Sequence, residues 1–484
     1  MTEHAVDVPA EPEGAGDYEP HPHRWRILGV ALAVGSMSLL DISIVNVAIP
    51  SMRAGLHTTS ATIQWVVSGY SLAFGLTLVA GGRLGDAYGR RRMMLWGLAG
   101  FVASSAAVGL APTAALVVAA RLLQGATAGL LTPQNSGLIQ QLFRGRERAR
   151  AFGLFGFTVS TASAIGPVLG GLIIAIAGQE SGWRWLFLVN LPIGLAAMVA
   201  VAKLVPKRPP ESVEHGARID VVGALLLGLA VVSLLLPVVQ VERHSYLPLL
   251  LLTLVPVFGY AFARWELRLR RLGRPPLLDV GLLRTVPGYV GGLGIGTLYF
   301  TGFTGLILVT SVYLQEGLGY SPLQAGLLII PFAVGSAVSA PAAGRYVSDA
   351  GRRLTVGALL VMMTGTLLFL LLAPGRDPFW PWSVPTLLLA GLGGGAVVSP
   401  NITLTLSEVP PRMGGAAGGA LQTGQRIGAS IGAALLVTAY GLGSDPDSSL
   451  RLALATGLVL LALALAMAVR VLRQPGSDPL SRPG

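Results

Sequence analysis

The chain has 484 residues, of which 52% are hydrophobic and only 12% are charged. Soluble domains carry roughly 25% charged residues, so this composition excludes an ordinary soluble protein and indicates one that crosses a membrane many times. The absence of cysteine excludes disulfides and thiolate metal sites. A formal net charge of +11 is explained by the sorting of basic residues to one side of a membrane, so we expect no nucleic-acid partner.

The first predicted element is a tail. Residues 1–24 are acidic, contain proline and lack the features of a cleaved signal peptide, so we expect a disordered cytoplasmic segment. Apolar runs of about 18–25 residues then recur, each long enough to span a membrane as a helix. Because the runs are continuous rather than alternating, we predict an all-α polytopic membrane protein and not a barrel. The fourteen predicted transmembrane helices are 27–49, 63–82, 93–111, 114–138, 150–177, 185–205, 220–240, 247–266, 288–315, 323–344, 354–373, 383–406, 414–440 and 450–472.

The orientation of these helices follows from the basic residues, which fall mostly in the loops on one side. Cytoplasmic loops of membrane proteins are enriched in Lys and Arg, so the N-terminus is predicted to be inside. With an even number of spans the C-terminus is inside too, and residues 473–484 form a second cytoplasmic tail. The outer side would keep only Arg53, Arg184, Arg243, Arg376 and Arg451.

Asp41 lies in the stretch "LLDISIVNVAIP" and is the only acid deep in any predicted span. An ionised acid at the bilayer centre costs about 2.5–3.5 kcal/mol on insertion scales, so a chain keeps one there mainly to bind or move a charge. At the rise of an α-helix, Asp41, Arg121 and Arg426 lie about 9, 10 and 12 Å below the outer edge of a core about 30 Å thick. We therefore expect one polar cluster, in which Arg121 tunes proton binding by Asp41. The alternative is a fixed structural ion pair.

Two predicted cytoplasmic loops resemble one another, "GRLGDAYGRRRMM" after the second span and "GRYVSDAGRRL" after the tenth. Their glycines are seven residues apart in both, although the aspartate is displaced by one. Internal duplication is typical of secondary transporters, and a chance match between two basic turns is the alternative. The related positions are Gly82, Asp86, Gly89 and Arg90 in the first loop and Gly344, Asp349, Gly351 and Arg352 in the second.

The first loop matches the G-x-L-x-D-x-x-G-R-R signature of the major facilitator superfamily, and the chain resembles the fourteen-span drug:proton antiporters of that superfamily. "LDISIVNVAIP" is similar to the first-span motif of that branch, with Ser43 where threonine is usual. "RLLQGATAG" and "GPVLGG" resemble its fourth-span and fifth-span motifs, although Ala162 replaces an expected glycine. "WRWLFLVNLPIG", "YLQEGLGYSPLQAG" and "QTGQRIGASIGAA" also resemble this branch. The resemblance covers roughly residues 25–472.

The resemblance implies a 6+2+6 arrangement. Residues 25–206 and 276–472 would each form a six-helix bundle, and residues 207–275 would supply two inserted helices with cytoplasmic linkers. Such proteins rock their bundles about a midplane site. A cytoplasmic gate is expected, in which the carboxylate of Asp86 meets a helix N-terminus or an arginine in one state only. The gate and conformational candidates are Gly82, Asp86, Gly89, Arg90, Gly166, Pro167, Asp349 and Arg352, with orientation charge and plain helix packing as the alternatives.

The substrate cavity is predicted from polar and aromatic residues in spans expected to face the centre. Aromatic faces and one carboxylate would suit a lipophilic cation, whereas hydrogen bonding between helices is the alternative. The cavity candidates are Gln124, Asn135, Tyr299, Phe303, Asn401, Gln422, Gln425 and Arg426. Glu316, at the outer end of the ninth span, is a second proton or cation candidate, and Asp220 is expected to cap a helix. No histidine falls within a span, and no metal site is expected.

These features predict a proton-coupled antiporter that exports lipophilic, often cationic, small molecules by alternating access. We expect a monomer in the bacterial plasma membrane, with the proton gradient as its energy source and no cofactor. A symporter, or a lipid or metabolite transporter of the same fold, is the alternative. A membrane enzyme is disfavoured, because no nucleophile–base or metal constellation is present in the sequence and no catalytic residue is proposed.

Overall fold

The computed structural model describes residues 20–178, 180–207, 220–241, 247–274, 276–278, 286–407, 409–410 and 413–473. Most of the two predicted tails, the linker after residue 207 and Arg243 therefore lie outside the described residues. The described elements are all helical. Eleven helices are long and apolar enough to cross a membrane, within the part of the chain that is described. The protein is thus a multi-pass membrane protein.

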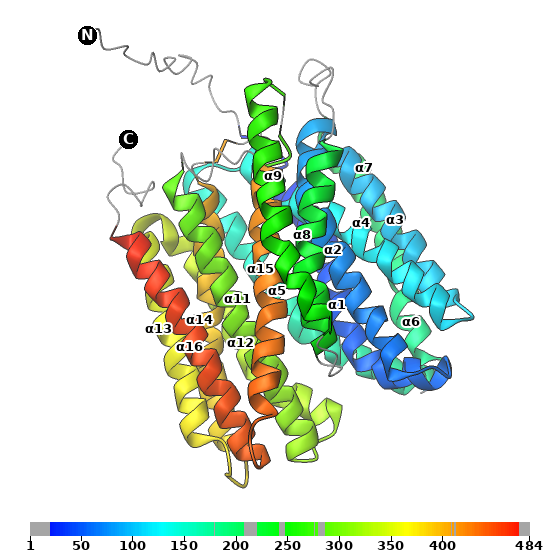
Figure 1. Ribbon diagram of the computed structural model, residues 1–484, viewed down its shortest axis with the longest axis vertical. Coiled ribbons are helices and arrows are strands. Elements are labelled where there is room, and N and C mark those ends of the chain that lie inside the picture. Colours follow the sequence, from blue (N-terminus) through cyan, green and yellow to red (C-terminus); the bar gives the residue numbers. More distant parts are fainter. Residues whose placement is uncertain are drawn as a thin grey trace.

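The first half of the chain forms one bundle, drawn from blue to cyan-green in Figure 1. Here the sixth predicted span is two helices that meet at Val189 and Asn190, just before Pro192. Proline has no backbone N–H to donate, so it is tolerated in the first turn of a new helix. The helices are α1 (Arg24–Gly55), α2 (Ser60–Tyr88), α3 (Arg90–Leu110), α4 (Ala114–Leu142), α5 (Gly145–Ala177), α6 (Gly182–Leu188) and α7 (Asn190–Leu204).

The second half forms another bundle, drawn from light green to red. Its α12 and α16 begin with capping boxes, in which Ser321 and Asp445 bind backbone N–H groups of the first turn. The helices are α11 (Pro287–Val312), followed by the π-helical turn η3 (Tyr313–Gly317), α12 (Pro322–Ala350), α13 (Arg352–Leu372), α14 (Trp380–Leu406), α15 (Gly414–Tyr440) and α16 (Pro446–Leu472).

Two further helices lie between the halves in the sequence. They are α8 (Val221–Val241) and α9 (Leu254–Arg271), the latter preceded by the 3-10 turn η2 (Leu247–Thr253). In Figure 1 they run in green along the front of the molecule, where α8 contacts α2 of the first half and α15 of the second. All fourteen predicted spans coincide with helical segments, but α5, α8 and α15 are not among the eleven apolar candidates.

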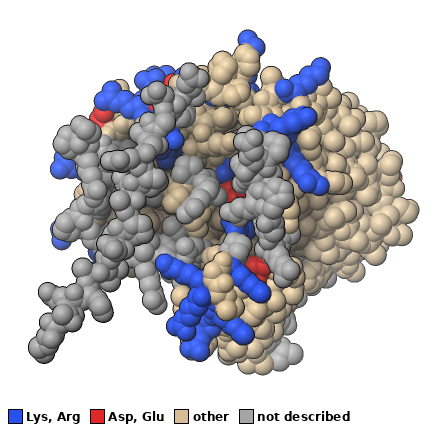
Figure 2. Space-filling model, turned by 90° about the horizontal axis from the view of Figure 1, so that it is seen from above, with Lys and Arg blue, Asp and Glu red and all other residues tan. Residues whose placement is uncertain are grey.

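Basic residues gather at one end of the molecule, which Figure 2 views from above. We name it the basic end, because three arginines (Arg90, Arg91 and Arg92) begin α3 there and three more (Arg268, Arg270 and Arg271) end α9 there. The two halves share an apolar core that includes Phe74 and Leu78 of α2 together with Ile402 of α14 and Leu421 of α15. In this structure the halves are therefore packed together across that part of their interface.

The repeated loops adopt related conformations. Gly89 separates α2 from α3 and Gly351 separates α12 from α13, with φ angles of 93° and 55° that other residues rarely adopt. The earlier glycines permit close contact between the halves. A Cβ atom on Gly82 would lie 2.2 Å from the carbonyl oxygen of Gly415 in α15, and one on Gly344 would lie 2.7 Å from the Cα atom of Gly153 in α5. Each loop thus meets the fifth long helix of the opposite half.

Candidate proton site and gate

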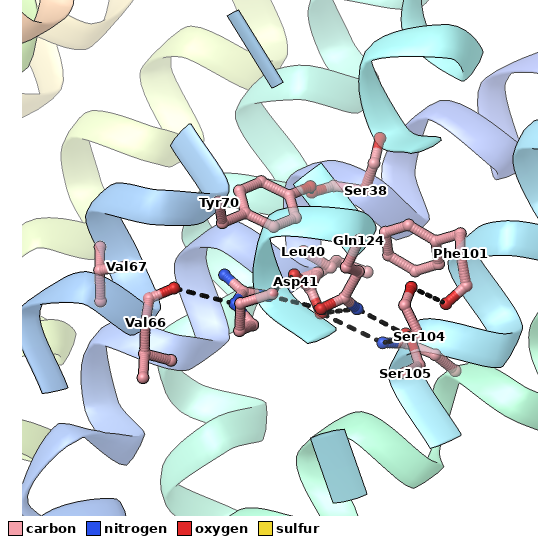
Figure 3. Close-up of polar contacts among 12 residues, drawn as sticks. Ser38, Leu40, Asp41, Val66, Val67, Tyr70, Phe101, Ser104, Ser105 and Gln124 are labelled. Carbon is pink, nitrogen blue, oxygen red and sulfur yellow. Dashed lines mark hydrogen bonds and ion pairs between the residues drawn. The ribbon is translucent and has the colours of Figure 1, made fainter. Parts of the chain in front are cut away.

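Asp41 and Arg121 form an ion pair inside the first half. Asp41 comes from the middle of α1 and Arg121 from α4, and Oδ2 of the carboxylate lies 2.5 Å from Nη1 of the guanidinium. Both side chains are only 1% exposed. Figure 3 shows the carboxylate surrounded by polar groups from neighbouring helices. The structure therefore brings together two of the three charges that lie at similar predicted depth.

Every part of this ion pair has further hydrogen-bond partners. Gln124 donates to Oδ1 of Asp41 over 3.0 Å and accepts a 2.8 Å hydrogen bond from Arg121. Asn190 donates to the same Oδ1 over 3.2 Å, and Ser105 accepts hydrogen bonds from both amides. Nε of Arg121 donates to the carbonyl oxygen of Val66 in α2. Buried charges are tolerated only with such pairing, and this network draws on five elements, α1, α2, α3, α4 and α7.

The guanidinium of Arg121 also rests on aromatic rings. Its central carbon lies 4.1 Å from the ring centroid of Tyr70 and 5.5 Å from that of Phe187. A cation over an aromatic face is stabilised independently of any carboxylate. The two rings therefore hold Arg121 in place in addition to its pairing with Asp41.

Arg426 does not join this network, which corrects the expectation of a three-charge cluster. It comes from α15 in the second half, and its guanidinium carbon lies 4.8 Å from the ring centroid of Phe74 in α2. Phe74 in turn stacks on Tyr70, with centroids 6.0 Å apart. Similar depth did not bring Arg426 to Asp41, because α2 and its two rings stand between them. A continuous stack nevertheless links Arg121 to Arg426.

Asp86 ties the two halves together at the basic end. Its Oδ1 and Oδ2 accept hydrogen bonds of 3.2 and 2.9 Å from the backbone N–H groups of Gly415 and Ala416, in the first turn of α15. Arg90 pairs with the same carboxylate at 2.7 Å. The helix dipole and free N–H groups at a helix N-terminus favour a carboxylate there. Asp86 thus meets both partners expected of a gate, a helix N-terminus and an arginine, in one conformation.

The second repeated loop makes a weaker version of this contact. Asp349 of α12 pairs with Arg146 of α5 at 2.8 Å, but the two side chains are 58% and 74% exposed. Arg352 is buried and donates to the carbonyl oxygen of Gly288 in α11. The displacement of the aspartate by one residue therefore matters, because it moves the carboxylate from a buried contact to the surface. Both loops contribute contacts between the two halves at the basic end, and the contact of Asp86 is the buried one.

Four predicted cavity residues are buried in contacts between helices instead. Gln124 belongs to the hydrogen-bond network around Asp41, and Asn135 is fully buried. Tyr299 donates to the carbonyl oxygen of Gly394, and Asn401 to that of Gly292. Buried polar groups tend to find partners within a bundle, as Tyr299 and Asn401 do on neighbouring helices, whereas the amide of Asn135 has no hydrogen-bond partner among the described residues.

The other cavity candidates lie nearer the boundary between the halves. Gln422 donates to the hydroxyl of Ser136 across that boundary over 3.1 Å. Phe303, Gln425 and Arg426 are partly exposed, and Phe303 stacks with Tyr299 at 5.5 Å between centroids. Gln422 and Arg426 thus contact the first half, whereas Phe303 packs on Phe300 and Phe332 of its own half, and the cavity role of all four stays a prediction.

Two further predictions concern positions away from the centre. Glu316 lies in the turn η3 and is exposed, beside Tyr440. Gly166 of α5 faces α1, where an added Cβ would lie 1.9 Å from Oγ of Ser43. This close approach explains a packing role for Gly166, whereas a conformational role for it and for Pro167 stays a prediction.

Sequence reasoning missed several members of these sites. Asn190 and Ser105 complete the network around Asp41. Asn190 falls in the motif "WRWLFLVNLPIG", and that motif could have indicated Asn190 as a site residue from the sequence. Glu266 of α9 is another buried acid, 1% exposed, beside Asp220 near the basic end. Asp220 accepts from the N–H of Gly223 at the start of α8, as a helix cap does. Among the described residues, no cluster of three potential metal ligands occurs.

Comparisons with known proteins agree with the fold. The sequence profile of the Major Facilitator Superfamily matches residues 31–433. A probable actinorhodin transporter of Streptomyces coelicolor is 37% identical over 90% of this chain and 75% of its own length. The puromycin resistance protein pur8 of Streptomyces alboniger is 34% identical over 89% of this chain and 85% of its own.

The structural comparison points the same way. The crystal structure of the human organic anion transporter MFSD10 has a TM-score of 0.68 at 18% identity, covering 93% of this chain and all of that one. At this identity the likeness concerns the fold alone. The chain belongs to the Major Facilitator Superfamily, and it is a membrane transporter rather than an enzyme.

Proposed function

We propose that the protein is a proton-coupled antiporter that exports lipophilic small molecules, antibiotics among them. The observation that carries this proposal is the buried Asp41–Arg121 pair with its network of amide and hydroxyl partners. When this carboxylate takes up a proton, the pair is left with the charge of Arg121, and the guanidinium retains its ring and backbone partners to stabilise that charge. The names of the two bacterial relatives support drug export as the direction.

Helix α2 supports a coupled mechanism, because it contacts the arginine of the buried ion pair, Arg426 of the second half and the start of α15. Tyr70 of α2 underlies Arg121, Phe74 underlies Arg426 of the second half, and Asp86 binds the start of α15. A change of charge at Asp41 is therefore communicated to an element that also holds the halves together. Protonation from one side and release on the other, with α2 tilting in between, would give alternating access.

The proposed topology has fourteen spans, with α6–α7 and η2–α9 each counted as one. Both ends of the chain would lie in the cytoplasm, and the basic end would be the cytoplasmic face of the bacterial plasma membrane. We propose that the protein works as a monomer without a cofactor and draws its energy from the proton gradient.

The decisive experiment compares the parent protein with Asp41→Asn in proteoliposomes with an imposed proton gradient. Export of puromycin, actinorhodin and the dye ethidium would be measured in both directions of the gradient. Asp41→Asn should abolish gradient-driven export while the protein remains inserted and folded. The matched control is Asp349→Asn, which neutralises an exposed aspartate and should retain gradient-driven export.

Two results would contradict the proposal. Normal gradient-driven export by Asp41→Asn would remove Asp41 from the coupling reaction. Accumulation of substrate in the same direction as proton flow would instead indicate symport, the alternative mode of this fold.

A further inference from the structure

Arg426 is a cation in the middle of the molecule without an acidic partner. It lies twelve residues into α15, which begins at Gly414, and so about 18 Å along that helix. Within the described part of the chain its guanidinium has no ion pair and no hydrogen bond, and its ring contact is with Phe74. The side chain is partly exposed, whereas Asp41 and Arg121 are almost completely buried. An arginine at this depth without a counter-charge is costly, which calls for an explanation.

No described acid is placed to neutralise Arg426. Asp41 is already balanced by Arg121 at 2.5 Å. The other described acids lie at helix ends or in loops near them, and Asp86, the next along α2, is bound to Arg90 and to the start of α15. The central region between the halves therefore carries a net positive charge. This positive charge would repel a cationic substrate. The carboxylate that was expected to bind such a substrate, Asp41, is already paired with Arg121.

The surroundings of Arg426 define more than a charge. Phe74 and Tyr70 stack nearly parallel, with 15° between their planes, and Arg426 covers the face of Phe74. A guanidinium that rests on a ring keeps its N–H groups free at its edges, where they can bind an oxyanion in a bidentate manner. The partly exposed amide of Gln425 lies next to it in the sequence of α15. Tyr70 and Phe74 are themselves fully buried, so they support the partly exposed guanidinium from one side and leave its outer edge to an anionic group.

We propose that Arg426, held in place by Phe74, binds the anionic group of the substrate, such as a carboxylate, a sulfonate or a phenolate. This inference rests on the proposed function only in placing the substrate between the halves, and it specifies the charge class of that substrate. The rings also connect the anion to the proton site, because Tyr70 carries Arg121 on its face. Helix α2 thus carries both the ring under Arg426 and the ring under Arg121.

Three probes with the same ring system test the charge class. They are anthracene-9-carboxylate, the neutral anthracene-9-methanol and the cation anthracene-9-methylammonium. Equilibrium binding to the purified full-length protein in nanodiscs is measured by anthracene fluorescence, without any gradient. The carboxylate should bind about tenfold or more tighter than the alcohol, as a charge-assisted hydrogen bond provides, and the ammonium more weakly than both.

Three variants identify the cation responsible. Arg426→Gln should remove the preference for the carboxylate, and Arg426→Lys should keep part of it. Phe74→Leu keeps the charge but removes the ring on which Arg426 rests, so it should reduce the preference for the carboxylate without abolishing it. Each variant is first shown to be monodisperse with a Tm close to that of the parent.

The outcomes separate this inference from the proposed function. A parent protein that binds the ammonium as tightly as the carboxylate, or that binds no carboxylate, would overturn the anion site. The same conclusion follows if Arg426→Gln keeps the tenfold preference. Failure of Asp41→Asn to impair gradient-driven export would instead overturn proton coupling and leave the binding result untouched.

Discussion

Substitution of Asp86 by asparagine should open the basic end of the transporter. In the parent structure the carboxylate accepts two backbone hydrogen bonds from the first turn of α15, and its side chain is 1% exposed. Asparagine has almost the same shape but no charge, and its one carbonyl oxygen can accept from only one of the two sites while its NH₂ group faces the other N–H. The Arg90 pair lies within one segment of the first half, so it does not by itself join the two halves.

The size of the effect follows from the bonds that cross between the halves. Hydrogen bonds to a charged group contribute about 1.5–3 kcal/mol each, and neutral ones about 1 kcal/mol. Loss of one such bond and weakening of the other should destabilise the closed state by about 2–3 kcal/mol, which is a shift of about 30- to 150-fold in the closed-to-open ratio. Substrate affinity should change little, because Asp86 lies at the end of α2 and not beside Phe74.

Spin labels can report this shift cleanly, because the chain has no native cysteine. Arg150→Cys in α5 and Arg345→Cys in α12 are exposed positions on opposite halves near the basic end. Electron–electron distance measurements in nanodiscs should show a longer distance in Asp86→Asn than in the parent. Asp349→Asn is the matched control, since its exposed ion pair contributes about 0–1 kcal/mol and should shift the distribution little. Identical distributions in the parent and in a folded Asp86→Asn would refute the gate.

Two more substitutions test the contacts at the basic end. Gly82→Ala places a Cβ atom 2.2 Å from the carbonyl oxygen of Gly415, so the same label pair should separate as it does in Asp86→Asn, whereas Gly171→Ala, where no atom lies within 4 Å, should leave the distance unchanged. Equal distances in both alanine variants would show that α2 and α15 need not approach so closely. Glu147 accepts two hydrogen bonds from Arg24, which lowers the pKa of its carboxyl group. At pH values above the ordinary glutamate pKa of about 4.3, the pair should therefore add at most about 1 kcal/mol to the free energy of unfolding. This contribution should be lost as the pH falls through the lower pKa of Glu147 in the folded protein. Thermal unfolding of Glu147→Gln should differ from that of the parent at pH 7 and not at pH 3, and a difference that persists at pH 3 would assign the effect to packing.

The helices and their order could be predicted from the sequence because the signals are local. A stretch of apolar residues about 30 Å long must satisfy its own backbone hydrogen bonds in a membrane, which leaves a helix as the solution for each run. The two related loops were visible for a similar reason, since glycine is required where the chain turns between helices at Gly89 and Gly351. The sixth span was predicted as continuous, and its division before Asn190 became evident only in the structure.

The proximity of Asp41 and Arg121 was predicted from their similar depth in the membrane. Opposite charges buried at one depth are expected to pair, because an unpaired charge in a medium of low dielectric costs much free energy. Depth says nothing about direction around the helix axis or about which helix stands between two others. That is why Arg426, at a similar depth, was expected in the cluster and lies instead beyond Tyr70 and Phe74. The same limit applied to Tyr299 and Asn401, whose polarity indicated a cavity and which donate instead to backbone carbonyls of neighbouring helices.

The sequence by itself determined that the protein is an all-helical membrane transporter with one buried acid near a buried arginine. These properties depend on hydropathy, on the cost of charge in lipid and on short motifs, which act within one segment. Only the tertiary structure decided that Asp86 reaches the start of α15 and that Arg426 rests on α2 without an acid. Such contacts join residues more than 300 positions apart, and they depend on how the two halves pack, which no local pattern specifies.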